Sequence, residues 1–230
     1  MNLVQSYRKP LNLGVPVGDS FATARHDRLQ LNLLGVEFTN ASMPEPPSIR
    51  PDYRKVIADL SIESALAEYR PAVIGTPPLG IAIETSDIDI ACSASDLRQF
   101  REVVDTEFGA QRDYRSRQSS PQGHQAVVIS FHAFGWEVEI FCQNLPIEKQ
   151  WGVRHFRVEQ RLLRLAPHLR LRIHQFKQMG LKTEPAFARA LRLKGDPYLV
   201  MLDLESNSDE QLIALANEPD GFADNQWSAG

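Results

Sequence analysis

Two aspartates separated by a single residue, Asp87 and Asp89, are the side chains of this sequence with the clearest chemical meaning. Alternate side chains of a β-strand leave the same face, so the two carboxylates would lie side by side. Carboxylates that close repel one another and favour a cation between them. Mg²⁺ prefers oxygen ligands and is usually shared with substrate phosphates. The pair therefore predicts a two-metal phosphoryl-transfer site for Mg²⁺, with Mn²⁺ as the alternative ion.

A third carboxylate is expected from a second strand. The run Trp136–Phe141 alternates between apolar and acidic residues, which places Glu137 and Glu139 on one face. We favour Glu139 as the third catalytic and metal-binding residue, because it lies deeper in the strand and farther from the turn. Glu137 stays open as the alternative.

A glycine loop precedes the aspartate pair. Gly75 and Thr76 follow a short apolar run, and Gly80 comes five residues after Gly75. Glycine lets the backbone approach a phosphate closely, exposed N–H groups can hold an anion, and the Thr76 hydroxyl can contact the same phosphate. Lys182 lies beside the expected start of a helix. An anion would be favoured there by the lysine charge and by the partial positive charge of the helix N-terminus.

The elements that must position these residues can be read from apolar spacing. A helix is expected from Asp52 until Pro71 stops it, and another after Ser95, which we expect to cap it. Strands are expected over 72–74 and 87–92, and over 126–132 and 136–142 as a hairpin. Helices are expected over 160–165, 169–179 and 183–193, with a restart at Asp196-Pro197. This order predicts an α+β fold: a small mixed or antiparallel sheet with flanking helices, followed by a helical C-terminal part.

The domain organisation follows from composition. Prolines interrupt residues 1–50, which we interpret as an irregular N-terminal lead-in. Residues 51–150 are expected to form the catalytic core and residues 151–218 a helical C-terminal region. Residues 219–230 are small and polar and are expected to form a flexible tail.

Charge is unevenly distributed. The net charge is −4, but residues 154–194 carry 11 basic and 2 acidic side chains, a field that attracts phosphate. Arg154, Arg157, Arg161 and Arg164 are spaced for one helix face, which indicates either contact with phosphate or RNA, or an ordinary solvated face. The two cysteines lack CxxC spacing, and no apolar run is long enough to span a membrane. We therefore expect a cytoplasmic protein with no membrane partner.

A resemblance supports this interpretation. Gly75-Thr76, then Gly80, then Ser86-Asp87-Ile88-Asp89 resembles the signature of the polymerase-beta-like nucleotidyltransferase superfamily, above all the minimal nucleotidyltransferases. The run 180–188 and the residues Gly195-Asp196-Pro197-Tyr198 resemble a bacterial family of unknown function assigned to that superfamily. The resemblance covers roughly residues 54–205. It implies Mg²⁺, a nucleoside triphosphate such as ATP, and a phosphate loop of Gly75 and Thr76 in front of metal ligands Asp87 and Asp89.

The sequence departs from the superfamily pattern in this loop. Thr76 stands where serine is usual, Leu79 stands where arginine is common, and Pro77-Pro78 stiffens the chain. The expected function is a Mg²⁺-dependent nucleotidyltransferase that moves a nucleoside monophosphate to an acceptor hydroxyl of a small molecule, a protein or an RNA. The alternatives are a non-catalytic nucleotide-binding or regulatory module with a degenerate site, and an RNA-directed transferase or RNA binder.

Overall fold

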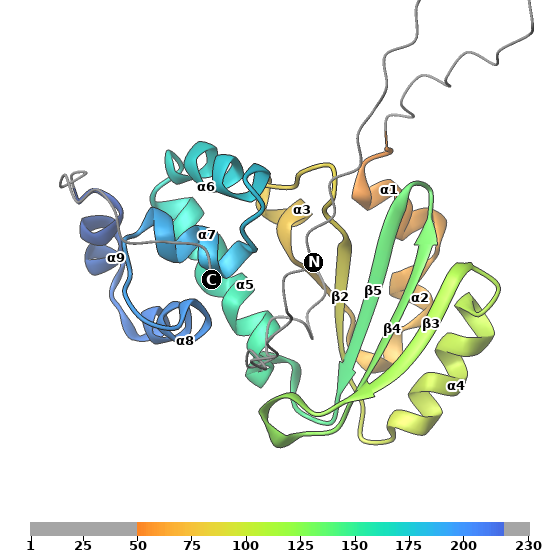
Figure 1. The fold of residues 1–230 in the computed structure, drawn as a ribbon. Coiled ribbons are helices and arrows are strands. Elements are labelled where there is room, and N and C mark those ends of the chain that lie inside the picture. Colours follow the sequence, from red (N-terminus) through yellow and green to blue (C-terminus); the bar gives the residue numbers. More distant parts are fainter. Residues whose placement is uncertain (1–49, 219–230) are drawn as a thin grey trace, which may run out of the picture. The chain divides into compact units, whose positions relative to one another are not determined.

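The computed structural model describes residues 50–218, which all belong to one compact unit (Figure 1). Apart from Arg50, the predicted lead-in over 1–50 lies outside the described residues, and so does the predicted tail over 219–230. The predicted boundary between residues 51–150 and 151–218 stays a prediction.

A five-stranded mixed sheet forms the centre of the described region. Its strands are β1 (Ala72–Ile74), β2 (Ile88–Ser93), β3 (Arg112–Ser119), β4 (Ala126–Ala133) and β5 (Trp136–Gln143). They lie in the order β1-β2-β5-β4-β3. The β2–β5 pair is parallel and the other three pairs are antiparallel. The predicted α+β class and mixed sheet are confirmed.

Helices surround the sheet and make up most of the C-terminal part. The helices and 3-10 turns before β5 are α1 (Tyr53–Asp59), α2 (Ile62–Ala65), η2 (Ala67–Tyr69), α3 (Thr76–Leu79), α4 (Leu97–Phe108) and η3 (Pro121–Gly123). Those after β5 are η4 (Ile147–Lys149), α5 (Trp151–Leu165), α6 (Leu169–Gln178), α7 (Thr183–Ala190), α8 (Pro197–Asp203), η5 (Leu204–Ser206) and α9 (Asp209–Ala216). None of the helices between residues 50 and 218 is long and apolar enough to cross a membrane.

The two faces of the sheet differ because its strands alternate. Ile88 and Ile90 of β2 point to one face, where they pack with Phe100 of α4 and with α1 and α2 in the first hydrophobic core. Helices α1, α2 and α4 therefore cover one face of the sheet (Figure 1). Asp89 must then point to the opposite face, as the sequence predicts.

A second hydrophobic core joins α3 to the C-terminal helices. Its fully buried members include Leu162 of α5, Ile173 of α6, Phe187 of α7 and Met201 of α8, and Leu79 of α3 packs with them. The loop that precedes the aspartate pair is therefore attached to the helical region by apolar contacts.

Several local features differ from the sequence-based expectation, among them one helix break, one helix cap and one strand. The helix expected after Asp52 is broken at Ser61, which adopts a left-handed backbone. The helix α4 is capped by Asp96 rather than Ser95, because the Asp96 carboxylate accepts hydrogen bonds from the backbone N–H groups of Arg98 and Gln99. Strand β3 was not predicted, and its largely exposed, polar residues explain why.

The second core gives a matched test with one kind of substitution. Leu162 is fully buried, whereas Leu171 on α6 is 69% exposed. We expect Leu162→Ala to lower the free energy of unfolding by about 2–5 kcal/mol, because it removes a buried side chain and leaves a cavity. Leu171→Ala should change it by less than about 0.5 kcal/mol. Urea denaturation of both variants measures the difference, and equal effects would contradict this assignment of the core.

Candidate active site

Two carboxylates of the predicted site, those of Asp89 and Glu139, lie on the face of the sheet opposite the first core. Asp89 of β2 and Glu139 of β5 are direct partners across the parallel strand pair, and Asp87 stands immediately before β2. All three are buried, with residue exposures of 4% for Asp87, 2% for Asp89 and 1% for Glu139. The structure therefore places Asp89 beside Glu139, with Asp87 two residues before Asp89 in the chain, and their role as metal ligands stays a prediction.

Gly75 lies directly against the Asp89 carboxylate. A Cβ atom built on Gly75 would stand 2.2 Å from Asp89 Oδ2, and the Gly75 backbone has φ +79° and ψ −160°. Only glycine fits this position, for the contact and for the backbone alike. Asp89 Oδ1 is buried without a hydrogen-bond partner among residues 50–218. A carboxylate packed this closely and left with an unsatisfied oxygen is suited to receive a cation.

The hydroxyl groups of Thr76 and Ser86 form hydrogen bonds within the segment that connects β1 to β2. Thr76 and Ser86 are hydrogen-bonded with 3.0 Å between their hydroxyl oxygens, and the backbone N–H of Ile83 donates to the Ser86 hydroxyl. Both hydroxyl residues are buried. Arg50 donates to the carbonyl oxygens of Ser86 and Ile83 at 2.8 and 2.9 Å. These bonds fix the segment that delivers Asp87 into the site.

Two other residues predicted to bind the nucleotide stand at helix ends. Gly80 ends α3 with φ +70°, at the opposite end of that short helix from Gly75. Lys182 is the N-cap of α7, where Thr183 was expected to cap. The contacts described for residues 50–218 connect neither Gly80 nor Lys182 to Asp87 or Asp89, and their roles stay predictions.

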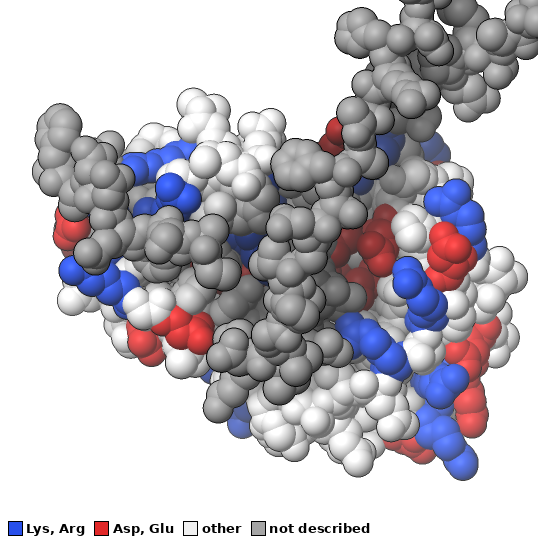
Figure 2. Space-filling view, in the orientation of Figure 1, with Lys and Arg blue, Asp and Glu red and all other residues white. Residues whose placement is uncertain are grey.

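Arginines of strand β3 flank the acidic residues of β5. Arg117 lies 3.7 Å from Glu139 and Arg115 lies 4.0 Å from Glu137, as nitrogen-to-oxygen distances. The Glu137 side chain is 42% exposed and that of Glu139 only 2%. Figure 2 shows acidic side chains gathered over the region of β2 and β5, with basic side chains beside them. Of the two glutamates on this face, Glu139 is the one enclosed beside Asp89.

Burial makes Asp89 difficult to ionise. Desolvation raises the pKa of Asp89 to about 8, and the neighbouring negative charge of Glu139 adds to the rise. A cation in the site would act in the opposite direction and favour the ionised form. Cation binding should therefore release a proton and strengthen as the pH rises.

A second buried group of charges lies in the helical region and was not predicted. It contains Glu159 of α5, Lys177 of α6 and Glu184 of α7, each at most 6% exposed. Burial raises the pKa of both glutamates and lowers that of Lys177, and the charges of all three interact with that of Asp89. The helical region and the sheet site are thus electrostatically connected.

Two contacts attach members of this group to neighbouring residues. The Lys177 ammonium donates to the Thr183 hydroxyl at 3.3 Å, and His155 Nδ1 lies 3.5 Å from a Glu184 oxygen. His155 was expected near the surface but is 1% exposed. A sequence signal did exist, because Glu159 and Glu184 are the only acidic residues within the basic segment 154–194.

The donor set of the sheet site fits a magnesium ion of the kind shared with phosphates. Within residues 50–218, no three His, Cys, Asp or Glu side chains are grouped closely enough to hold a metal ion by themselves. Mg²⁺ is commonly bound by one or two carboxylates, with water and substrate phosphates completing its shell. Asp87 and Asp89 supply such a pair, and the unsatisfied Asp89 oxygen supports it.

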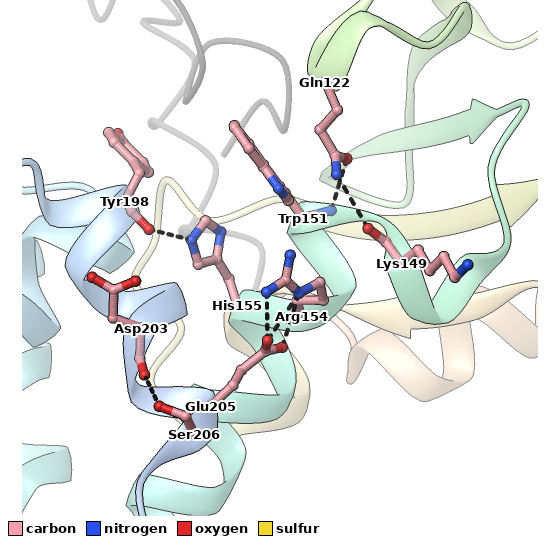
Figure 3. A network of polar contacts seen from close by, with 9 residues as sticks. All are labelled: Gln122, Lys149, Trp151, Arg154, His155, Tyr198, Asp203, Glu205 and Ser206. Carbon is pink, nitrogen blue, oxygen red and sulfur yellow. Dashed lines mark hydrogen bonds and ion pairs between the residues drawn. The ribbon is translucent and has the colours of Figure 1, made fainter.

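The basic face of α5 is largely neutralised by acidic residues near the C-terminus. Arg154 forms a two-pronged ion pair with Glu205, as Figure 3 shows, and Arg161 and Arg164 both pair with Asp209. His155, next to Arg154, bonds the carbonyl oxygen of Tyr198 at 2.8 Å (Figure 3). These contacts attach α5 to α8, η5 and α9. The arginine-lined face of α5 therefore has a structural role at Arg154, Arg161 and Arg164, which pair with acidic residues of the same chain.

The contact between Gly75 and Asp89 generates a matched test. Gly75→Ala places a methyl group on the Asp89 carboxylate and also strains the backbone. Gly123→Ala meets the same kind of strain, with φ +76°, but no atom within 4 Å. We expect Gly123→Ala to cost about 1–3 kcal/mol and Gly75→Ala clearly more, by thermal and urea unfolding. A smaller effect at Gly75 would contradict the close contact.

The raised pKa of Asp89 predicts how stability depends on pH. The folded protein holds this proton up to about pH 8, whereas the unfolded chain releases it near 3.8. The contribution of Asp89 to stability is therefore present below pH 4 and is lost as the pH rises toward 8. We therefore expect the Tm of Asp89→Asn, minus the Tm of the unchanged protein, to increase as the pH is raised from 5 to 8.5 without Mg²⁺.

The exposed aspartate Asp59 provides the control for this measurement. Asp59→Asn should show no such gain in Tm, because its side chain is not buried. Millimolar Mg²⁺ should reduce the difference between the unchanged protein and Asp89→Asn. A constant Tm difference across this pH range would refute the effect of burial on Asp89.

Comparison with known proteins gives distant structural similarities and one family. No curated protein sequence matches this chain. A Cid1 poly(U) polymerase bound to MgGTP is similar at 12% identity, with a TM-score of 0.40 over 55% of this chain and 40% of that one. The GLD-2/RNP-8 complex is similar at 10% identity, with a TM-score of 0.43 over 77% of this chain and 71% of that one. The chain thus spans about 40% of the length of the Cid1 polymerase.

The model of the domain of unknown function DUF4269 matches residues 55–204, well over half of the chain. This protein belongs to the DUF4269 family.

Proposed function

We propose that this protein is a Mg²⁺-dependent nucleotidyltransferase, which moves a nucleoside monophosphate from a nucleoside triphosphate to an acceptor hydroxyl. The observation that supports it most is the pairing of Asp89 with Glu139 across β2 and β5, with Asp87 immediately before β2. Three buried carboxylates on one face of a sheet are costly to keep without a cation. The cluster of buried carboxylates lowers the stability of the fold, and we therefore assign it to a reaction that uses the charge of a metal ion.

Each residue of the site has a definite part in this proposal. Asp87 and Asp89 hold the metal, which when bound neutralises the phosphate oxygens and the developing charge on the acceptor oxygen. Gly75 lets the backbone stand against Asp89, and Thr76 with Ser86 keeps that backbone rigid. Such positioning is the larger part of catalysis in phosphoryl transfer.

Glu139 is proposed as the third carboxylate of the site. Its ion-pair contact with Arg117 of β3 aims it toward the same face as Asp89. Arg117 is the more exposed partner, with 40% of its side chain accessible. An arginine at this place can also face the negative charge of an incoming substrate, because guanidinium groups bind phosphate well.

A non-catalytic nucleotide-binding module is the second candidate, and Leu79 favours it. This residue replaces the arginine common in minimal nucleotidyltransferases, and it is 3% exposed and packed in the second core. It cannot reach a triphosphate. A module of this kind would bind nucleotide without releasing pyrophosphate.

Nucleotide binding is the first test, because the acceptor is not known. We expect calorimetric titration with ATP, GTP, CTP and UTP to reveal Mg²⁺-dependent binding of at least one triphosphate. Asp87→Asn should weaken it about 10-fold or more, or about 1.4 kcal/mol, because a metal ligand is lost. Asp59→Asn, which changes an exposed aspartate of α1, serves as the matched control and should bind normally.

The outcomes separate the two candidates. Binding that needs Mg²⁺ and Asp87, together with pyrophosphate release in an acceptor screen, supports the transferase. Triphosphate binding whose affinity is the same without Mg²⁺ and in Asp87→Asn supports the non-catalytic module. If no triphosphate binds, both candidates are refuted.

A further inference from the structure

A cleft of about 430 Å³ lies beside the loop that leads into β2. Its walls come from the chain around α1, from α3 and from the first turn of α6, and three arginines line it: Arg50, Arg54 and Arg170. The volume lies within the range of small-molecule sites. Neither the metal ligands nor the hydroxyls of the glycine loop are among its lining residues.

Arg50 carries a charge that no ion pair in the described region neutralises. Its guanidinium donates to two carbonyl oxygens and lies 3.8 Å from the centre of the Trp136 ring. No carboxylate of residues 50–218 stands within 4.0 Å of it, although the exposed residue Glu84 acts on it electrostatically. The guanidinium is therefore fixed in place and still positively charged.

Arg170 is held in the same manner from the opposite wall. Its Nε donates to the carbonyl oxygen of Leu79 at 3.4 Å, and its Nη1 donates to that of Leu163 at 3.3 Å. It too lacks an ion-pair partner among the residues described. Gly80 lies beneath it, with space where a side chain would otherwise stand. Two fixed and uncompensated guanidinium groups thus line one cleft.

The third arginine, Arg54, is exposed and partly neutralised. The Arg54 side chain is 70% exposed and lies 3.4 Å from Asp52. It also stands over the Tyr53 ring, 4.6 Å from its centre. The cleft therefore has a net positive charge, with Tyr53 and Pro78 providing less polar surface.

The cleft is adjacent to the proposed catalytic residues. Arg50 bonds the carbonyl oxygen of Ser86, and Ser86 directly precedes Asp87. A ligand in the cleft would thus stand one loop away from the buried carboxylates. The arginines attract an anionic group, so a ligand with one anionic end would be oriented with that end in the cleft.

We propose that this cleft binds the phosphate of the acceptor, and that the acceptor is a nucleotide or the end of a single-stranded RNA. This rests on the proposed transferase function and names its acceptor class. Guanidinium groups match phosphate oxygens in a two-pronged geometry. Tyr53 also lines the cleft, with the Arg54 guanidinium over its ring.

The test measures acceptor binding separately from triphosphate binding. The probes are a fluorescent ten-residue oligoribonucleotide and a nucleoside monophosphate, titrated into the full chain. We expect Arg170→Gln to weaken binding of at least one probe 5-fold or more and Arg170→Lys to retain most of it. For the oligonucleotide, the slope of log affinity against log salt should become shallower by about 0.7. The control Arg98→Gln, on exposed α4 surface, should leave both unchanged.

The outcomes distinguish the two sources of phosphate and the two proposals. Loss of oligonucleotide binding alone identifies RNA, and loss of monophosphate binding alone identifies a small nucleotide. Unchanged affinity for both probes in folded Arg170→Gln and Arg54→Gln, or no binding of either probe, overturns the acceptor proposal. If the triphosphate still binds with dependence on Asp87 in that case, the transferase proposal survives.

Discussion

A carboxylate held in the interior of the protein, with a peptide backbone pressed against it, is the constraint on which the site depends. Asp89 is held in an inner strand of the sheet because its neighbours Ile88 and Ile90 are anchored in the first core. Gly75 must then lack a side chain, and the loop after it must be rigid. The bonds among Thr76, Ser86 and Arg50 provide that rigidity. These features cost stability or freedom, and a charged ligand would offset the cost.

Much of this arrangement could be predicted because it follows from short-range patterns. The alternation around Asp89 identified both its strand and its face, and the expected turn at Ala133–Gly135 identified the hairpin that carries Glu139. If both strands belong to one sheet, the acidic residues of β2 and β5 can lie on the same face of that sheet in only a few arrangements. That Asp87, Asp89 and Glu139 act together as a site stays a prediction, and the parallel pairing of β2 with β5 was what the structure added.

The features that were not predicted depend on long-range contacts. Strand β3 is a polar edge strand, so it lacks the apolar alternation by which strands are recognised. Helix α3 contains Pro77 and Pro78, which were interpreted as loop residues, although proline is tolerated in a first helical turn. Glu159 and Glu184 lie on different helices and meet only through packing, which no local window can reveal.

The parallel pairing of β2 with β5 also has a consequence for the order in which the molecule is made. Helix α4 and strands β3 and β4 are synthesised between the two partners, so Asp89 has no strand beside it on that side until β5 has been made. The hairpin of β4 and β5 can form locally and quickly, whereas joining it to β2 requires closing a long loop. A nascent chain would therefore expose its acidic residues to water until a late stage. If these carboxylates hold a metal ion as proposed, that ability would appear with the last strand of the sheet rather than grow gradually.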